Sequence, residues 1–194
     1  MLRLLIGFCV LFAITSALAD GVRLVEKMPA LDAPRNFGNF RFGASTSNRN
    51  GHPDLCLELT PLSFLSVEGC GTGTGVLHND DQSEVAHFRA KLRLANWRTE
   101  GRFVQPHLSA GFAELQQGDD EPGFEFTGTG AAQNETAGPE VGVSLKILAP
   151  IGESKYEWVA EVGVSAAWLT HAPDLADPQS VQQTSVALSM GFGF

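Results

Sequence analysis

The sequence has few charges, few cysteines and few long apolar runs, and each shortage excludes a class of protein. Charged residues make up 18% of the 194 residues, against about a quarter in a typical soluble domain. Beyond the N-terminus no run approaches the roughly 20 apolar residues of a spanning helix, which excludes a polytopic helical membrane protein. Basic residues number 13 against 22 acidic ones, and the resulting formal charge of −9 argues against nucleic-acid binding.

The residues that are present indicate one folded, exported domain. The length fits about one domain of roughly 100–200 residues, and a hydrophobic content of 43% excludes a disordered chain. At the N-terminus, Arg3 precedes an apolar core over Leu4–Ile14 and the small residues Ala17-Leu18-Ala19. This order predicts a secretory signal peptide over Met1–Ala19. The alternative is an N-terminal membrane anchor.

Apolar and polar residues alternate with a period of two through eight segments, which predicts eight β-strands. The clearest segment is Gln183–Phe194, where Val186, Leu188 and Met190 alternate with small or polar residues. No helical periodicity competes with this pattern. The predicted strands cover residues 39–45, 55–59, 65–70, 86–94, 104–112, 140–147, 156–168 and 183–194.

The links between these strands alternate strictly between short and long. Long links therefore gather at one end of the sheet, and both termini lie at the other end. The short links lie near Pro61-Leu62, Trp97–Gly101 and Ala149–Ser154, and the long ones span Ser47–Pro53, Gly73–Ser83, Leu115–Glu135 and Thr170–Gln182.

The two faces of the strands differ in a way that favours a membrane barrel. A water-soluble sandwich or lipocalin-like barrel, the alternative, turns its apolar face inward. Here nearly every strand charge shares a face with glycine, serine and alanine, while the other face is apolar. We therefore predict an all-β fold, an eight-stranded antiparallel transmembrane β-barrel in up-and-down meander order. Aromatic girdles are expected at one rim from Tyr156, Trp158, Phe192 and Phe194, and towards the other from Phe88, Phe112 and Trp168.

The signal peptide, the eight strands, the loop alternation and the ending Val186–Phe194 together resemble small Gram-negative outer-membrane barrels, such as the transmembrane domain of outer-membrane protein A. The resemblance implies location in the cell outer membrane, with its lipids as partners. It also implies that the terminal aromatic Phe194 is the signal read by the barrel-assembly machinery. The expected organisation is a signal peptide over 1–19, a short periplasmic segment over 20–36 and the barrel over 37–194. The resemblance transfers no activity.

Charges on the inward face nearly cancel, with six basic and five acidic residues. Eight strands leave an interior just wide enough for side chains, and buried charges need partners. We therefore predict an interlocking salt-bridge core, with a narrow ion path as the alternative. Its members are Arg41, Arg89, Lys91, Arg93, Lys146 and Lys155 with Glu58, Glu68, Glu140, Glu157 and Glu161.

Cysteine positions predict one disulfide. Cys9 leaves with the signal peptide, so Cys56 and Cys70 remain as a pair in an exported chain. Two free thiols, the alternative, conflict with export. If the second and third strands fold about position 63, Cys56 faces Cys70 on the inward face. The same register opposes Glu58 to Glu68, which requires cations between them.

Candidate chemistry is sparse. His107 and Ser109 share the inward face with Glu140 and supply the residue types of a catalytic triad. A lipid-modifying enzyme, however, needs its nucleophile at the lipid face or outer rim, so we predict that the chain is not an enzyme. No histidine pair has metal-ligand spacing. The acidic loop from Asp119 to Glu125 lacks the spacing of a calcium loop, and a solvated loop is the favoured interpretation.

These observations predict a non-enzymatic outer-membrane barrel with a plugged interior and a structural or loop-mediated binding role. A lipid-modifying enzyme resembling lipid A deacylases and a narrow ion pore are the alternatives. No cofactor and no metal are expected, and the sequence does not identify an extracellular or periplasmic protein partner.

Overall fold

The structure is a computed structural model that describes residues 36–48, 51–74, 77, 82–117 and 134–194. The expected signal peptide, the segment up to residue 35 and the acidic positions from Asp119 to Glu125 lie outside the described residues. Within the described part of the chain, no helix is both long enough and apolar enough to span a membrane.

The described chain forms nine strands and one short 3-10 helix, η1 (Ala172–Asp174). The strands are β1 (Gly38–Ser45), β2 (Asp54–Leu62), β3 (Leu65–Gly71), β4 (Ser83–Arg93), β5 (Trp97–Thr99), β6 (Arg102–Gln117), β7 (Glu135–Pro150), β8 (Glu157–Trp168) and β9 (Gln182–Gly193).

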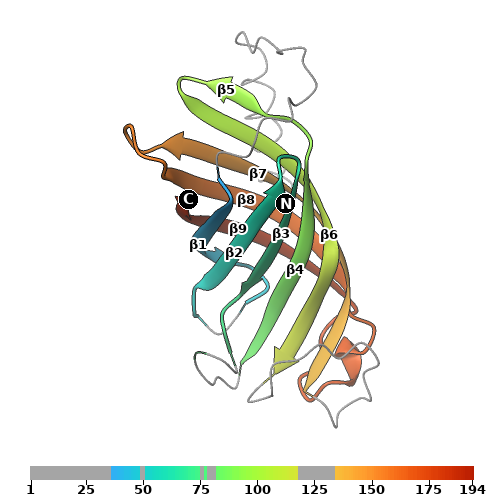
Figure 1. Ribbon diagram of the computed structural model, residues 1–194. Coiled ribbons are helices and arrows are strands. Elements are labelled where there is room, and N and C mark those ends of the chain that lie inside the picture. The colour runs from blue at the N-terminus through green and yellow to red at the C-terminus, as the bar shows by residue number, and fades with distance from the viewer. Residues whose placement is uncertain (1–35, 49–50, 75–76, 78–81, 118–133) are drawn as a thin grey trace, which may run out of the picture.

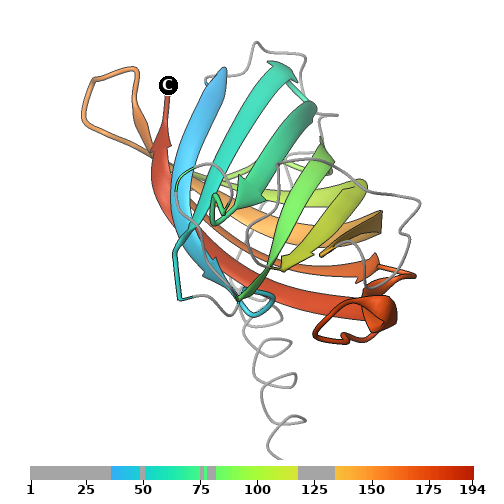
Figure 2. The same cartoon turned by 90° about the horizontal axis from the view of Figure 1, so that it is seen from below.

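Eight of these strands close into an antiparallel barrel in meander order. The sheet runs β4-β3-β2-β1-β9-β8-β7-β6, and β4 pairs with β6 to complete the ring (Figure 1). The first and last strands meet along Asn39↔Gly193 to Ser45↔Ala187, so the start of β1 and the end of β9 both lie at the short-turn end of the barrel. Viewed at right angles to Figure 1, the sheet curves round on itself (Figure 2). The predicted fold class, a closed eight-stranded antiparallel barrel, is confirmed.

The ninth strand, β5, occupies the link that the sequence predicted as a plain turn at Trp97–Gly101. It pairs with β6 through Trp97↔Val104 to Thr99↔Arg102. The connecting residues Glu100 and Gly101 have φ angles of 46° and 78°, and a two-residue turn with two positive φ angles matches the right-handed twist of a hairpin. The link therefore extends the barrel wall at the short-turn end.

Strands β6 and β7 extend further toward the long-loop end than the alternation predicted. They pair from Phe103↔Leu148 to Gln116↔Glu135, whereas the predicted strands stopped at residues 112 and 140. The apolar face of β6 is interrupted by Glu114 and Gln116, which ended the pattern in the sequence although the backbone ladder continues.

Closure of the ring brings neighbouring backbones very close at particular glycines. A Cβ atom added at Gly111 would lie 2.0 Å from the carbonyl oxygen of Phe88, and one at Gly191 would lie 1.9 Å from that of Phe40. Any side chain at these positions would push the neighbouring strand away. These glycines therefore permit the tight curvature of a small barrel.

Candidate functional site

The centre of the barrel is filled by six side chains that form the central charge cluster. They come from six different strands, and none is more than 8% exposed. Lys91 Nζ lies 3.1 Å from Glu58 Oε2, 2.9 Å from Glu68 Oε2 and 2.5 Å from Glu161 Oε1. The members of the cluster are Arg41, Glu58, Glu68, Lys91, Lys146 and Glu161.

The predicted register of β2 and β3 is confirmed, and with it the opposition of two like charges. Cys56 pairs with Cys70 and Glu58 with Glu68. Arg41 enters from β1 and contacts both carboxylates, and it also pairs with Glu161 across the lumen. The repulsion between opposed carboxylates is offset because each carries cations on more than one side.

Three carboxylates of this cluster lie close enough to hold a metal ion. Ligand atoms of Glu58, Glu68 and Glu161 are all within 4.8 Å of one another. The ammonium of Lys91, however, already contacts all three residues. A metal ion would have to displace this cation, so the arrangement suits an internal salt-bridge network.

A second group of charges lies next to the central cluster on the side of the long loops. Arg89 Nη2 lies 2.7 Å from Glu68 Oε1, and Arg89 Nη1 lies 3.7 Å from Glu140 Oε1. His87 Nδ1 is 2.9 Å from the same Glu140 oxygen. His87 was not among the predicted network members, although its inward position two residues before Arg89 was the signal that places it there.

Three residues grouped with the interior charges by the sequence lie apart from this network. Glu157 accepts a hydrogen bond of 2.5 Å from Asn36 at the short-turn end. Arg93 is half-buried, and among the described residues no carboxylate lies within ion-pair distance of it. Lys155 is exposed, with Nζ 5.4 Å from the ring centroid of Tyr156. Its predicted inward position is wrong because it belongs to the turn before β8, where strand alternation does not apply.

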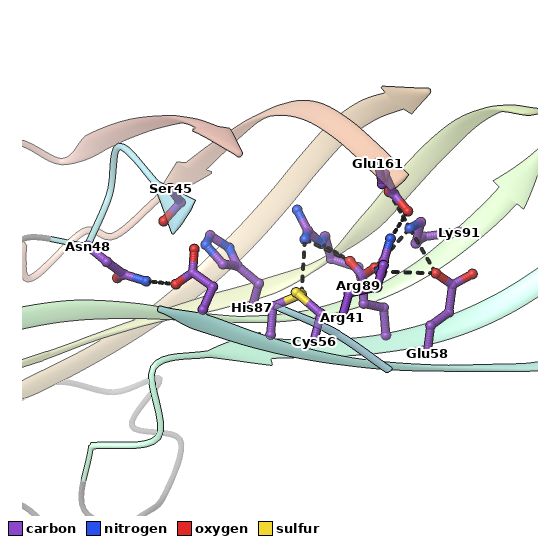
Figure 3. Close-up of a disulfide and its surroundings, with 12 residues drawn as sticks. Arg41, Ser45, Asn48, Cys56, Glu58, His87, Arg89, Lys91 and Glu161 are labelled. Carbon is purple, nitrogen blue, oxygen red and sulfur yellow. Dashed lines mark hydrogen bonds and ion pairs between the residues drawn. A yellow bond between two sulfur atoms is a disulfide. The ribbon is translucent and has the colours of Figure 1, made fainter. Parts of the chain in front are cut away.

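The predicted disulfide is confirmed. Cys56 and Cys70 are bonded, with Cα atoms 4.1 Å apart at opposed positions of β2 and β3. Arg89 Nη2 lies 3.8 Å from Cys70 Sγ, so the disulfide borders the charged interior (Figure 3). The bond thereby fixes the hairpin whose next inward pair is Glu58 and Glu68.

The residue types of a catalytic triad are present but do not form one triad. Glu140 pairs with His87 at 2.9 Å. His107 Nδ1 lies 3.0 Å from the backbone oxygen of Gln105. His107 and Ser109 are both buried inside the barrel, away from the outer surface where a lipid substrate would lie. The grouping of His107, Ser109 and Glu140 considered from the sequence is therefore not assembled.

The long-loop mouth of the barrel is filled by an apolar group that the sequence reasoning missed, here called the mouth cluster. It joins inward residues of three strands to the β8–β9 connection, which folds back over the opening. Leu169 and Ala172 are fully buried, and Leu175 is 3% exposed. The members are Val85, Ala113, Leu115, Ala167, Leu169, Ala172 and Leu175.

Backbone and side-chain hydrogen bonds hold the connection in this position. Gln117 Nε2 donates to the backbone oxygen of Asp177 at 2.7 Å, and the Asp177 amide donates to Gln117 Oε1 at 3.0 Å. The amide of Gln179 donates to the oxygen of Ala172 at 2.9 Å. The mouth cluster is thus a folded part of the barrel rather than a chance contact.

The outer surface of the barrel is apolar around its circumference. Away from the long-loop ends of β6 and β7, exposed apolar side chains recur at outward positions of every barrel strand and alternate with buried or half-buried inward ones. Leu188 is 59% exposed and Val143 56%. Among the charged residues at outward positions, Arg102 at the start of β6 is exposed, whereas Glu84 and Glu114 are buried and Glu135 is half-buried, all three near the long-loop ends of their strands.

Aromatic side chains mark the ends of this apolar surface, with one correction to the expected girdles. Trp158 stacks near Phe192, with ring centroids 4.4 Å apart, close to the short-turn end. Trp168 ends β8 at the long-loop end. Phe88 and Phe112 stack at 5.6 Å, but near the middle of β4 rather than at a rim, because β4 and β6 extend further than the alternation predicted.

Comparison with known proteins identifies no relative of this chain. No family model, no curated protein and no solved structure matches the chain.

Proposed function

We propose that this protein is an integral outer-membrane barrel of a Gram-negative bacterium, similar in architecture to the transmembrane domain of outer-membrane protein A. One observation carries the proposal, namely the uncharged outward face that encircles the barrel between the strand ends. In water, an apolar surface of this extent would drive association with other molecules. In a bilayer, it meets lipid tails.

The height of the apolar surface supports the proposal. Trp158 and Trp168 both point outward from β8, 51% and 39% exposed, and stand ten residues apart. At ~3.3 Å per residue and a strand tilt of about 40°, this separation spans roughly 25 Å along the barrel axis. That is about the height of the apolar band of outer-membrane barrels, and tryptophan is enriched at both of its edges.

The interior supports a closed barrel rather than a pore. Four basic side chains are paired with four acidic ones across the lumen. The mouth cluster adds an apolar layer above them. A lumen filled in this way leaves the long loops as the parts that meet other molecules, so we propose a structural or loop-mediated binding role without catalysis.

The test of membrane insertion combines fractionation with gel mobility. The protein is expected in the outer-membrane fraction and is expected to migrate differently in unheated and heated samples, since folded barrels resist detergent. The substitution Val162→Arg places a charge on the middle of the outer face and should cost about 2–4 kcal/mol in a bilayer. Its matched control, Thr170→Arg, lies beyond Trp168 in an exposed loop.

The outcomes separate a membrane barrel from a soluble one. Val162→Arg should lower the amount of folded protein in the membrane, whereas Thr170→Arg should leave it unchanged. Recovery of the wild-type protein as a freely soluble periplasmic species would contradict the proposal.

The assembly route is tested separately at the C-terminus. Phe194 is 48% exposed on the outer face, and its backbone pairs with Phe37 and Gly38 at the barrel seam. Deletion of Phe194 should reduce folded barrel in the membrane because it removes the terminal aromatic of the resembled assembly signal. Phe194→Tyr keeps an aromatic ring and is expected to assemble normally. Unchanged levels after the deletion would count against recognition of this residue.

A further inference from the structure

The hairpin of β5 and β6 carries the barrel wall beyond the closed ring at the short-turn end (Figure 1). Directly paired residues of antiparallel strands point to the same side of a sheet, so the register assigns each side chain of the hairpin to one face. The pairs are Trp97↔Val104, Arg98↔Phe103 and Thr99↔Arg102.

The two arginines of this hairpin lie on opposite faces. Arg98 stands opposite Phe103, with its guanidinium carbon 5.7 Å from the ring centroid. Phe103 in turn pairs with Leu148, which is 8% exposed at an inward position of β7. Arg102 is the neighbour of Phe103 along β6 and therefore points to the outer face of the barrel wall.

The outer face of the hairpin offers hydrogen-bond donors without an acidic partner. Arg102 and its cross-strand neighbour Thr99 are both exposed, and Trp97 and Val104 follow them on the same face toward the barrel. Among the described residues, no carboxylate lies within ion-pair distance of Arg102, and this includes Glu100 at the hairpin tip. A guanidinium beside a hydroxyl group is a donor pair that suits a phosphate oxygen.

Arg102 also stands at the level where lipid headgroups are expected. On the outer face of β6 the next charge is Glu114, twelve residues further along the strand. At ~3.3 Å per residue and a tilt of about 40°, this stretch covers roughly 30 Å, the thickness of the hydrocarbon core of a bilayer. The outward residues between the two charges are Val104, Pro106, Leu108, Ala110 and Phe112.

The two ends of the barrel differ in charge. At the short-turn end, Arg98, Arg102 and Lys155 stand with the exposed acids Glu100 and Glu153. In the sequence of the four long links, a single basic residue, Arg49, stands against eight acids, and an anionic surface is repelled there. These acids are Asp80, Asp81, Asp119, Asp120, Glu121, Glu125, Asp174 and Asp177.

We propose that the outer face of the β5–β6 hairpin binds an anionic phospholipid of the leaflet at the short-turn end, an inference that rests on the proposed membrane insertion. Arg102 pairs with the phosphate, and the hydroxyl of Thr99 donates a further hydrogen bond. The acyl chains lie along the outward apolar residues of β6 from Val104 to Leu108. Trp97 stands at the interface, where tryptophan is enriched.

The chemistry of the surface selects this class of lipid. Arginine recognises a phosphate through two parallel hydrogen bonds. A free phosphate lacks the chains that would cover the adjoining apolar wall. A zwitterionic lipid carries its own cation beside the phosphate, which weakens the attraction of Arg102.

The test uses Trp97 as a reporter beside the site. The chain has three tryptophans, so Trp158→Phe with Trp168→Phe leaves Trp97 alone. The purified protein is inserted into phosphatidylcholine vesicles, and its fluorescence is quenched by brominated phosphatidylglycerol or brominated phosphatidylcholine. One basic residue at an anionic surface strengthens binding about fivefold. We expect a preference of about that size for phosphatidylglycerol at low salt, and a smaller one at high salt.

Substitutions in the reporter protein assign the preference to the outer face. Arg102→Gln should abolish the preference, and Thr99→Val should lower it. Arg98→Gln is the matched control, because it removes the same charge from the same hairpin but from the opposite face, and it should retain most of the preference. Inorganic phosphate, added at constant ionic strength, should not displace the lipid. Heat-modifiable gel mobility confirms that each variant is folded.

Several outcomes would overturn the proposal. Equal quenching of Trp97 by the two lipids rules out the site, as does a preference that survives in Arg102→Gln. A loss as large in Arg98→Gln would mean that the charge of the hairpin acts without a specific contact. Displacement by inorganic phosphate would identify a site for free phosphate.

A second reporter separates this proposal from membrane insertion itself. A protein that keeps only Trp158 should be quenched by brominated phosphatidylcholine, because Trp158 is 51% exposed on the outer face. Absence of that quenching would contradict the proposed insertion and the lipid site together. Quenching of Trp158 without a lipid preference at Trp97 would contradict the lipid site alone.

Discussion

The central charge cluster and the mouth cluster occupy the same lumen, one above the other, but fill it by different physical means. In the centre, Lys91 contacts three carboxylates that belong to three strands. At the mouth, Leu169, Ala172 and Leu175 pack against apolar residues of the strands. Charged side chains stabilise only when each finds a partner of opposite sign, whereas apolar side chains need only contact and exclusion of water.

This difference predicts how each region tolerates change. Removing one member of the charge cluster leaves the others buried and unpaired, so the damage spreads through the network. Shortening one apolar residue of the mouth cluster removes local contacts and leaves a cavity. A change in the central charge cluster should therefore lower the stability of the whole barrel, whereas a change in the mouth cluster should promote local unfolding at the long-loop end.

The largest effect is expected from Lys91→Met. Three carboxylates would lose a shared cation, and breaking a buried ion pair from one side costs about 3–5 kcal/mol. Urea unfolding in micelles should show this loss of free energy. Lys155→Met, at an exposed turn position, is the control and should change the stability little.

The double variant Lys91→Met with Glu161→Gln sharpens this prediction. It removes one charge of each sign and should recover part of the lost stability. A loss for Lys91→Met no larger than that of the control would show that the buried ion pairs contribute little to the fold.

A smaller effect is expected at the mouth from Leu175→Ala. Leu175 is 3% exposed and packs in the mouth cluster, and truncation of a buried leucine costs about 2–5 kcal/mol. The value should lie at the lower end because the connection can relax toward solvent. Pro173→Ala, at an exposed position of the same connection, serves as the control.

The readout that distinguishes mouth from centre is hydrogen exchange. In Leu175→Ala, the amides of Leu169, Ala172 and Gln179, which are hydrogen-bonded within this connection, should exchange faster while those of the central strands remain protected. Equal acceleration throughout the barrel would mean that the two regions unfold as one unit.

The sequence was a good guide to the centre because the relevant pattern is local. A period of two places Arg41, Glu68 and Lys91 on the inward face without knowledge of the fold, and the arithmetic of a hairpin brings Glu58 opposite Glu68. The sequence pattern did not predict that Arg41 and Lys91 pair with Glu161. Those contacts cross the lumen between distant strands and depend on closure of the ring.

The mouth was missed for two separate physical reasons. Leu169 and Leu175 lie in a connection without alternation, so nothing local indicates that it folds inward. Ala113 and Leu115 of β6 do keep the inward parity, but Glu114 and Gln116 interrupt the run of apolar outward residues, so the sequence pattern ends before β6 does. The continuing ladder to Gln117 is a property of the backbone, which the side-chain pattern does not report.

A third prediction concerns Gly111, which lies on β6 between the level of Ser109 and the apolar Ala113. A Cβ atom at Gly111 would lie 2.0 Å from the Phe88 oxygen, so Gly111→Ala must separate β4 from β6. We expect a loss of about 1–3 kcal/mol, in the range of overpacked interiors, measured by urea unfolding. Gly69→Ala is the control, because the nearest atom there is a Phe88 ring carbon at 3.4 Å. Equal stability of the two variants would show that the strands move apart freely.

The smallest effect is expected from replacing both cysteines with serine. Cys56 and Cys70 are 14 residues apart, and a loop of about 15 residues corresponds to roughly 3 kcal/mol in the chain-entropy model. In this protein the disulfide should stabilise the folded state by only about 1–2 kcal/mol, because the barrel ladder already restricts the β2–β3 hairpin. Thiol labelling of the denatured, unreduced wild-type protein should find no free thiol at Cys56 or Cys70, and two free thiols would refute the bond.

The Cys56→Ser and Cys70→Ser double variant should also refold more slowly than the wild-type protein. Its folding rate should fall by a larger factor than its unfolding rate rises, since its hairpin must bring Glu58 opposite Glu68 before Arg41 and Lys91 are in place. A wild-type refolding rate in this variant would mean that the cations hold the hairpin register without help from the disulfide.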